Sequence, residues 1–322
     1  MSFQRDRGGR GPAEPPLPKP YAFVPLPRTV KHEQPAGHQK FQHLNGTLHA
    51  TVIARAPVHV ASGLLEPTRD RKYPLIKAHV RVNGRLAIPA TSLKGCIRSI
   101  VEAISPSAVA ITRARPLPRE AEPSRAVDRL DVTQRIFGAL GYQGQVRFSD
   151  APIQPENSQP EIVPSVQLFR PRHESVSTYF DGNRVKGRKF YMHGRLAEGD
   201  LPLEACPAGS RFSFRMDFEN LTGGELGLLL YALGLGEPKL WPKLGGAKPA
   251  CLGTIEVVDA RLETIDARAA YADFDVAPQP LAIAPLLQAA RDEKLVLDEQ
   301  LQRLAEVLRW PREDRGCPDR SY

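Results

Sequence analysis

The sequence lacks the features of a membrane-spanning or secreted protein. No apolar run approaches the roughly 18 residues that a transmembrane helix needs. The amino-terminal segment MSFQRDRGGRGPAEPP does not contain the hydrophobic core of a signal peptide. We therefore expect a cytoplasmic protein that has no membrane partner.

Cysteine is scarce, and its spacing argues against the usual cysteine-based sites. The four cysteines, Cys96, Cys206, Cys251 and Cys317, form no CxxC pair, which disfavours both a zinc knuckle and a disulfide framework. We expect ordinary thiols. The eight histidines are equally dispersed, so the sequence predicts no metal site.

Glycine motifs for nucleotide binding are absent as well. The chain contains neither the P-loop pattern GxxxxGK[ST] nor a glycine fingerprint that opens a helix. No Ser/His/Asp or Cys/His signature is recognisable. These absences disfavour nucleoside triphosphate chemistry and nucleophilic catalysis of the protease type.

Positive charge, by contrast, is in excess. Lysine and arginine number 44 against 36 aspartates and glutamates, which gives a formal charge of +8. This balance favours a polyanionic partner such as nucleic acid. The 322 residues suffice for a sizeable core, and the 31 prolines and 25 glycines indicate long connecting loops.

Apolar patterning predicts an α+β fold. The predicted helices cover 91–105, 226–235 and 298–310, and the predicted strands cover 47–55, 145–149, 210–220 and 254–263. Thr91 or Ser92 is the expected N-cap of the first helix, and Asn83-Gly84 the expected turn between two strands. We expect a flexible basic arm at 1–45, a core at 46–260 with insertions near 105–130 and 160–200, and a helical extension at 261–322.

A glycine-rich loop between Lys243 and Gly253 precedes the last predicted strand. Glycine allows a backbone to approach a ligand closely, and lysine attracts phosphate, so this loop is a candidate anion cradle. The alternative is that this loop only connects the preceding predicted helix to the last predicted strand. Lys94 and Arg98 share one face of the first helix, whose amino-terminal N–H groups also favour phosphate, although a solvated helix face fits equally well.

A basic hairpin is expected around Asp181-Gly182-Asn183. The return limb of this hairpin carries four cations within a segment that has few acids, namely Arg184, Lys186, Arg188 and Lys189.

Three segments resemble the RAMP superfamily of CRISPR-associated proteins. IPATSLKGCIRSIVEA, RIFGALGYQGQVRFSDAPI and LGGAKPACLGTIEV follow one another in the order of that family, over about 46–260. The resemblance is greatest to the backbone subunits of type III interference complexes. It implies a ferredoxin-like core that holds guide RNA, and a thumb-like hairpin inserted at the duplex of guide and target RNA.

The resemblance also implies roles for individual residues and partners. Guide RNA, target RNA and other effector subunits are the expected partners, bound mostly through backbone phosphates and 2′-hydroxyls. The implied RNA-binding residues are Ser92, Lys94 and Arg98 on the helix, Lys243, Gly245, Gly246 and Lys248 in the glycine-rich loop, and Arg184, Lys186, Arg188 and Lys189 on the hairpin.

Backbone subunits of this type often cut target RNA with an aspartate in the loop after the first strand. In the corresponding EPTRDRKYPLIK the aspartate is Asp70, two residues from the position that the family spacing gives to it, which is occupied by Lys72. Asp70, with Mg²⁺ as a possible cofactor, is therefore a catalytic candidate, and Glu66 is a weaker one. A surface ion pair is the alternative, and Asp150 is expected to form structural hydrogen bonds.

Two other functions remain open at this point. A guide-processing endoribonuclease of the same superfamily would often use a histidine, and His49 and His59 lie near the first predicted strand. A basic scaffold for protein partners would instead use the amino-terminal arm and the last helix.

Overall fold

The computed structural model describes residues 19–109, 121–157, 159–168, 177–273 and 275–319. At its centre is an antiparallel sheet with the strand order β18-β17-β2-β16-β9. Its strands are β2 (Leu44–Ala54), β9 (Val146–Phe148), β16 (Arg211–Leu221), β17 (Ile255–Thr264) and β18 (Gln279–Pro280). The long central strand β2 is apolar on its inner side, and it therefore anchors the core between β16 and β17.

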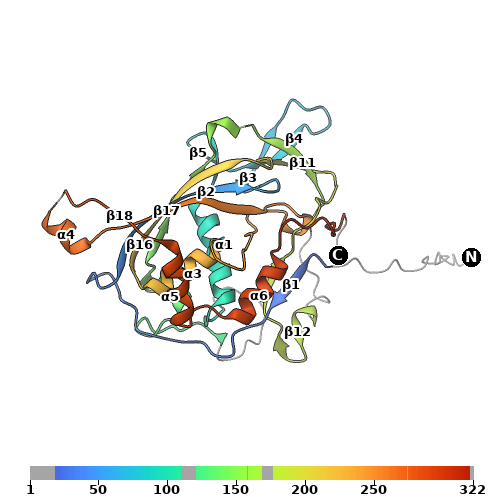
Figure 1. Ribbon diagram of the computed structural model, residues 1–322. Helices are drawn as coiled ribbons and strands as arrows, with labels where there is room; N and C mark the ends of the chain where they lie inside the picture. The colour runs from blue at the N-terminus through green and yellow to red at the C-terminus, as the bar shows by residue number, and fades with distance from the viewer. Residues whose placement is uncertain (1–18, 110–120, 158, 169–176, 274, 320–322) are drawn as a thin grey trace, which may run out of the picture.

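Helices cover one side of this sheet (Figure 1). Helix α1 follows β2 in the core and buries Leu93, Ile97, Ile100 and Ile104, the helical spacing that the sequence predicts. Helix α3 packs against α5, and α6 against α1. The helices are α1 (Ala90–Ile104), α2 (Val132–Phe137), α3 (Gly223–Ala232), α4 (Ala267–Ala272), α5 (Ile283–Asp292) and α6 (Asp298–Val307).

The start of α1 differs from the sequence prediction. Pro89 occupies the N-cap position and makes no side-chain cap, so the prediction of Thr91 or Ser92 is wrong. Instead, the backbone N–H of Ala90 donates to a carboxylate oxygen of Asp150 at 2.7 Å. A residue 60 positions away thus satisfies one of the unpaired N–H groups of the helix, and the structural role expected for Asp150 is confirmed.

A second sheet with the order β11-β15-β4-β3 lies above the central sheet in Figure 1. It contains β3 (Ala61–Pro67), β4 (Leu75–His79), β11 (Glu161–Ser165) and β15 (Leu201–Ala205). The adjoining strands β5 (Arg81–Val82) and β6 (Arg85–Ile88) are joined at Asn83 and Gly84, both with positive φ, as predicted. Strand β10 (Ala151–Pro152) pairs with β6, and β7 (Gly138–Ala139) with β8 (Tyr142–Gln143).

The amino-terminal segment joins the fold through a two-stranded ribbon. Strand β1 (Tyr21–Val24) pairs with β14 (Arg188–Tyr191), and Val24 is completely buried. The predicted hairpin is confirmed at its turn, because β12 (Phe180–Asp181) pairs with β13 (Arg184–Val185). Residues 1–18 of the predicted 1–45 arm, 110–120 of the predicted 105–130 insertion and 169–176 of the predicted 160–200 insertion lie outside the described residues.

Two of the four cysteines form a disulfide, which corrects the expectation of ordinary thiols. Cys251, in the glycine-rich loop, is bonded to Cys317, whereas Cys96 and Cys206 are free. The carboxy-terminal segment is also held by backbone hydrogen bonds, since the N–H of Cys317 donates to the carbonyl of Arg195 at 3.0 Å. The disulfide therefore fixes this segment beside the glycine-rich loop.

We expect the disulfide to contribute substantially to stability. It closes a loop with a sequence separation of 66, so Cys317→Ala should lower the free energy of unfolding by about 2–4 kcal/mol. Urea unfolding under non-reducing conditions measures this change. Cys96→Ala is the matched control, and an equal loss in both variants would contradict the assignment.

Candidate nucleic-acid interface

The structure brings together three segments that the sequence singles out. The thiol of Cys96 on α1 lies 3.5 Å from the carbonyl of Lys243 in the glycine-rich loop. The ammonium of Lys243 in turn donates to the carbonyl of Met192, the residue after β14, at 3.1 Å. Helix α1, the glycine-rich loop and the ribbon strand β14 are therefore neighbours, although more than a hundred residues separate the first two.

The glycine-rich loop uses much of its backbone for internal hydrogen bonds. The N–H of Gly246 donates to the carbonyl of His59 at 2.7 Å, that of Leu244 to Gly253 at 2.8 Å, and that of Gly253 to Pro57 at 2.9 Å. The N–H groups of Ala250 and Cys251 also donate within the loop. These five amides cannot point at a ligand, so the prediction of an amide cradle is wrong for them.

Close approach of the backbone explains the glycines of this loop. Gly245 has a φ of 87°, and a Cβ atom there would lie 2.3 Å from the carbonyl oxygen of His59. Gly253 also has a φ of 87°, and its Cβ would lie 2.0 Å from the carbonyl oxygen of Leu244. Only glycine fits both positions. Gly246 is half-buried and lies against the His59 ring.

Lys243 is buried, and its charge does not reach the surface. Its residue exposure is 7%, and burial, reinforced by Lys248 and Arg315, lowers its pKa to about 7. The predicted RNA contact by this side chain is therefore replaced by the hydrogen bond to Met192. Lys248 is half-buried and forms no ion pair with any described residue, so it is the loop lysine that can meet a polyanion.

Two predicted RNA-binding arginines share one buried carboxylate. Glu102 of α1 is 3% exposed. It lies 3.3 Å from the Nε of Arg98 and also forms an ion pair with Arg188 of β14. Burial raises the pKa of Glu102, and the two guanidinium groups oppose that rise. One carboxylate thus faces two cations, so the group as a whole retains positive charge.

The other helix residues are less exposed than the sequence suggests. The ammonium of Lys94 donates to the carbonyl of Val146 at 3.0 Å, and burial, with the nearby Arg98 and Arg147, lowers its pKa. Ser92 is half-buried on the same helix. Both residues are thus only partly accessible to a ligand.

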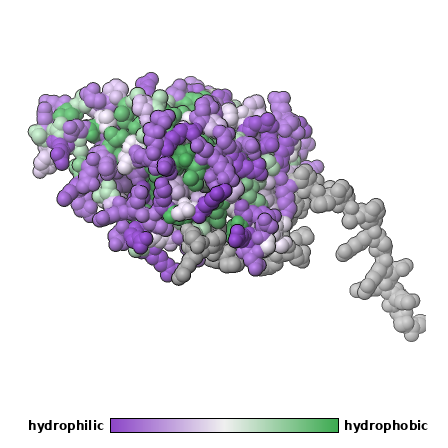
Figure 2. Space-filling view, turned by 60° about the horizontal axis from the view of Figure 1, so that its bottom comes forward, coloured by the Kyte–Doolittle hydropathy of each residue, from purple (hydrophilic) through white to green (hydrophobic). Residues whose placement is uncertain are grey.

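The hairpin cations fall into two environments. Arg184 and Lys186 are exposed and form no ion pair with any residue in the described part of the chain. Lys189 is half-buried, and its ammonium donates to the hydroxyls of Tyr179 and Tyr191 at 3.1 and 3.0 Å. The exposed positive charge of the hairpin therefore lies at its tip, on Arg184 and Lys186. Figure 2, in which the lower side of Figure 1 comes forward, shows a mainly hydrophilic surface.

Asp70 lies exposed in the loop between β3 and β4. Its carboxylate accepts the backbone N–H of Lys72 at 2.8 Å and, at 3.4 Å, that of Tyr73. The other candidate, Glu66, lies 3.7 Å from Arg81. No group of three or more acidic, histidine or cysteine side chains that could hold a metal ion occurs in the described residues. The residues around Asp70 do not fit a Mg²⁺ site of several carboxylates.

The two histidines near the first strand differ strongly in environment. His49 is exposed on β2, whereas His59 is 3% exposed and lies 2.6 Å, through Nδ1, from the carbonyl of Glu204. Burial lowers the pKa of His59. Of the two, only His49 is accessible to a substrate.

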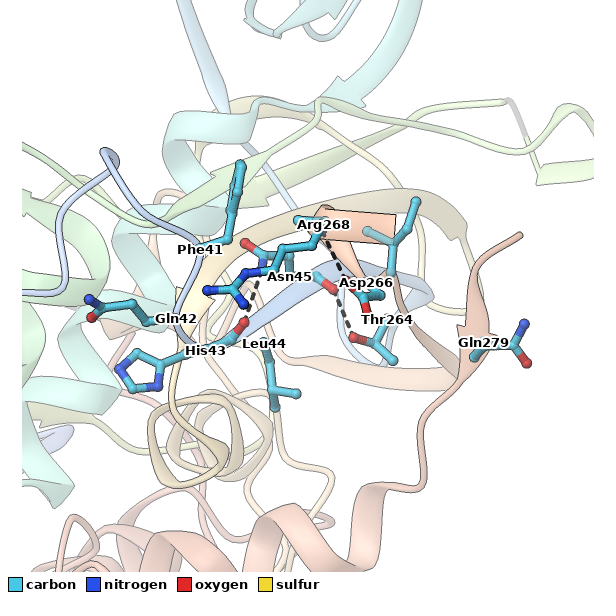
Figure 3. Close-up of a pocket in the computed structure, with 11 residues that line it drawn as sticks. Phe41, Gln42, His43, Leu44, Asn45, Thr264, Asp266, Arg268 and Gln279 are labelled. Atoms are coloured by element: carbon cyan, nitrogen blue, oxygen red, sulfur yellow. Dashed lines mark hydrogen bonds between the residues drawn. The ribbon is translucent and has the colours of Figure 1, made fainter. Parts of the chain in front are cut away.

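A pocket of about 680 Å³ opens elsewhere, where β2 begins and β17 ends (Figure 3). It lies at the end of β17 opposite to the glycine-rich loop. Several of its polar groups bind one another: Thr264 donates to the carbonyl of Asn45 at 2.9 Å, and Asn45 to that of His43 at 2.9 Å. The pocket contains none of the residues predicted to bind RNA.

Sequence reasoning did not identify Glu102 or the tyrosines around Lys189. Glu102 follows Arg98 by one helical turn, a spacing typical of an ion pair. Tyr21 and Phe23 alternate as they would on one face of a strand, and Lys189 and Tyr191 do the same. The partner of each strand, however, was not recognisable.

Comparison with protein families identifies a family for this chain. A model described as the RAMP superfamily matches residues 51–256, from within β2 to the second residue of β17. No curated protein matches the chain significantly. Within the described residues, no helix combines the length and apolarity that a membrane span requires.

We expect the burial of Lys243 to be measurable as a pH-dependent stability. The folded protein releases the proton of this lysine near pH 7, whereas the unfolded chain retains it up to its ordinary pKa of 10.5. The free energy of unfolding should therefore rise between these values, by at most about 1.4 kcal/mol per pH unit.

Lys243→Met removes this contribution, so its stability relative to the wild type should decrease from pH 7 to pH 9.5 in urea unfolding. Lys294→Met, at an exposed position, is the control. A difference between wild type and Lys243→Met that stays constant with pH would contradict the assignment.

Proposed function

Because the chain belongs to the RAMP superfamily, we propose that it is a guide-RNA-binding backbone subunit of a type III CRISPR interference complex. RAMP proteins are CRISPR-associated and bind RNA, so the general function follows from the family. The assignment to a backbone subunit of a type III complex depends on the order of the three motifs and on the surface where they meet. Its partners are then guide RNA, target RNA and other effector subunits.

The topology of the central sheet supports a ferredoxin-like core. In chain order its elements are β2, α1, β9, β16, α3 and β17, and in space its four main strands run β17-β2-β16-β9. This is the βαββαβ order with the first and third strands in the middle of the sheet. The basic hairpin β12-β13 between β9 and β16 supports a thumb-like insertion.

The observation that carries the proposal is the meeting of α1, the glycine-rich loop and β14. Each carries cations, and Lys248 of the loop forms no ion pair with any described residue. The hairpin that precedes β14 adds Arg184 and Lys186, which form none with the described residues either. Side chains, and not the loop amides, then supply the phosphate contacts. Such contacts give salt-dependent binding that is largely independent of sequence.

The alternative functions have less support. A guide-processing endoribonuclease of this superfamily would often use a histidine, but His59 is buried and held by the Glu204 carbonyl, which leaves His49 on the sheet. A purely protein-binding scaffold does not explain the exposed cations Arg184 and Lys186 of the hairpin.

We expect Lys186→Glu with Lys248→Glu to weaken binding of single-stranded guide-like RNA about tenfold or more at 150 mM salt. The salt dependence of binding should also become less steep, because fewer counterions are released. Filter binding at several salt concentrations measures both quantities. Lys294→Glu, at an exposed position after α5, is the control, and unchanged binding by the double variant would count against the proposal.

We further propose that Asp70 takes part in cleavage of bound target RNA. This side chain is exposed in a loop with Arg69, Arg71 and Lys72, whose charges favour the approach of a phosphate. Its carboxylate also accepts two backbone hydrogen bonds in the turn. A useful substitution must therefore remove the negative charge of Asp70 while keeping an oxygen that accepts these two hydrogen bonds.

Asp70→Asn keeps an oxygen acceptor for the turn and removes the charge, whereas Asp70→Ala removes both. If the carboxylate acts on RNA, both variants should retain guide binding and lose target cleavage. Gel analysis of labelled target RNA measures the rate. Full cleavage by Asp70→Asn would eliminate a role for the carboxylate.

A further inference from the structure

We infer that the outer face of the β1-β14 ribbon binds unpaired nucleotides by stacking their bases on aromatic rings. This aromatic ribbon face consists of Tyr21, Phe23, Lys189 and Tyr191, with Tyr179 beside it. The inference rests on the proposed RNA-binding function and adds to it a site for single-stranded RNA.

Strand alternation builds the face. Tyr21 is opposite Tyr191 and Phe23 opposite Lys189, so these four side chains point to the same side of the ribbon. The side chains on the other side of the ribbon point inward, where Val24 is fully buried and Arg188 binds Glu102. The outer side chains are all half-buried, and they therefore reach the surface from fixed positions.

The rings form a connected cluster. Tyr21 lies edge-on to Phe23 at 5.7 Å and to Tyr191 at 6.1 Å between ring centroids. Tyr179 is nearly parallel to Tyr21, at 6.3 Å and 11°. Because packing already orders these rings, a base that stacks on the cluster would cost little additional side-chain entropy.

An ammonium group is fixed at the centre of the cluster. The Nζ of Lys189 lies 4.7 Å from the ring centroids of Tyr21 and Tyr191 and 5.2 Å from that of Tyr179. Burial disfavours its charge, but hydrogen bonds to the Tyr191 and Tyr179 hydroxyls raise its pKa. The site therefore combines π surfaces with a fixed positive charge, as surfaces for single-stranded nucleic acid do.

Charge favours RNA over a protein as the occupant. Segments 19–31 and 177–195, which the ribbon brings together, contain Asp181 as their only acid. Lys19 lies 5.9 Å from the Tyr21 ring, and Arg184 and Lys186 are exposed in the adjoining hairpin. Strands β1 and β12 lie near each other at the lower right of Figure 1. A polyanion with flat bases matches both properties of this surface.

The face also continues the proposed guide-binding surface. Arg188 links β14 to α1 through Glu102, and Met192 links it to the glycine-rich loop through Lys243. RNA that binds along these elements would therefore also meet the ribbon. We expect little base preference, because every base offers a face for stacking.

Replacing both Tyr21 and Phe23 by leucine tests the inference while keeping apolar bulk. The double variant should bind single-stranded RNA about 5- to 100-fold more weakly than the wild type, the range expected for loss of base stacking. Its binding to duplex RNA of the same sequence should change little. Phe41→Leu is the matched control, because Phe41 is 48% exposed and lines the separate pocket.

A second measurement needs no substitution. Single-stranded RNA with 2-aminopurine should lose fluorescence on binding to the wild-type protein, and ultraviolet cross-linking should map to peptides containing Tyr21 or Tyr191. This result supports the inference even if the double variant folds poorly, which its thermal melting would reveal.

The possible failures are distinguishable. If the wild type binds neither single-stranded nor duplex RNA, both the proposed function and the inference fall. If the folded double variant binds single-stranded RNA as well as the wild type does, only the inference is overturned. Unchanged RNA binding with weakened self-association in sedimentation would assign the face to protein contacts instead.

Discussion

A buried carboxylate on α1 determines where several cations of this protein can act. Glu102 is 3% exposed and binds Arg98 on its own helix and Arg188 on β14. Removing the partners of a buried charge typically costs about 3–5 kcal/mol, so this contact holds the ribbon against the helix. Because Arg188 points inward, strand alternation turns its neighbour Lys189 outward to the tyrosines. The buried carboxylate of Glu102 thereby fixes which side chains of the ribbon point inward and which point outward.

Local features of the fold could be predicted from the sequence, because their causes are local. The apolar period of α1 and the alternation of β16 and β17 gave their positions to within a few residues. The turn at Asn83-Gly84 followed from the residues that tolerate positive φ. Membership of the RAMP superfamily was recognisable from three ordered segments, and the family match at 51–256 confirms it.

Contacts between distant residues were not predictable, because no local pattern encodes them. Asp150 replaces the expected cap of α1 across 60 positions, and Cys251 finds Cys317 across 66. The glycine-rich loop shows the same limit. Glycine and lysine suggested an anion cradle, but the fold uses Gly245 and Gly253 to pass close to backbone carbonyls and buries Lys243. Residue type alone does not distinguish approach to a ligand from approach to the protein's own backbone.

Net charge is therefore a poor guide to where RNA binds, even where it correctly indicates a polyanion. The +8 of the chain includes a buried lysine, arginines paired with Glu102 and a lysine held among tyrosines. Pairing and burial remove or fix many of these charges, so a binding surface depends on which cations lack acidic neighbours. The pairing of β1 with β14 joins the segments 19–31 and 177–195, which contain Asp181 as their only acidic residue. We propose that the ordered aromatic rings of the same ribbon add stacking to this basic surface, an interaction that flexible single strands of RNA use in addition to charge.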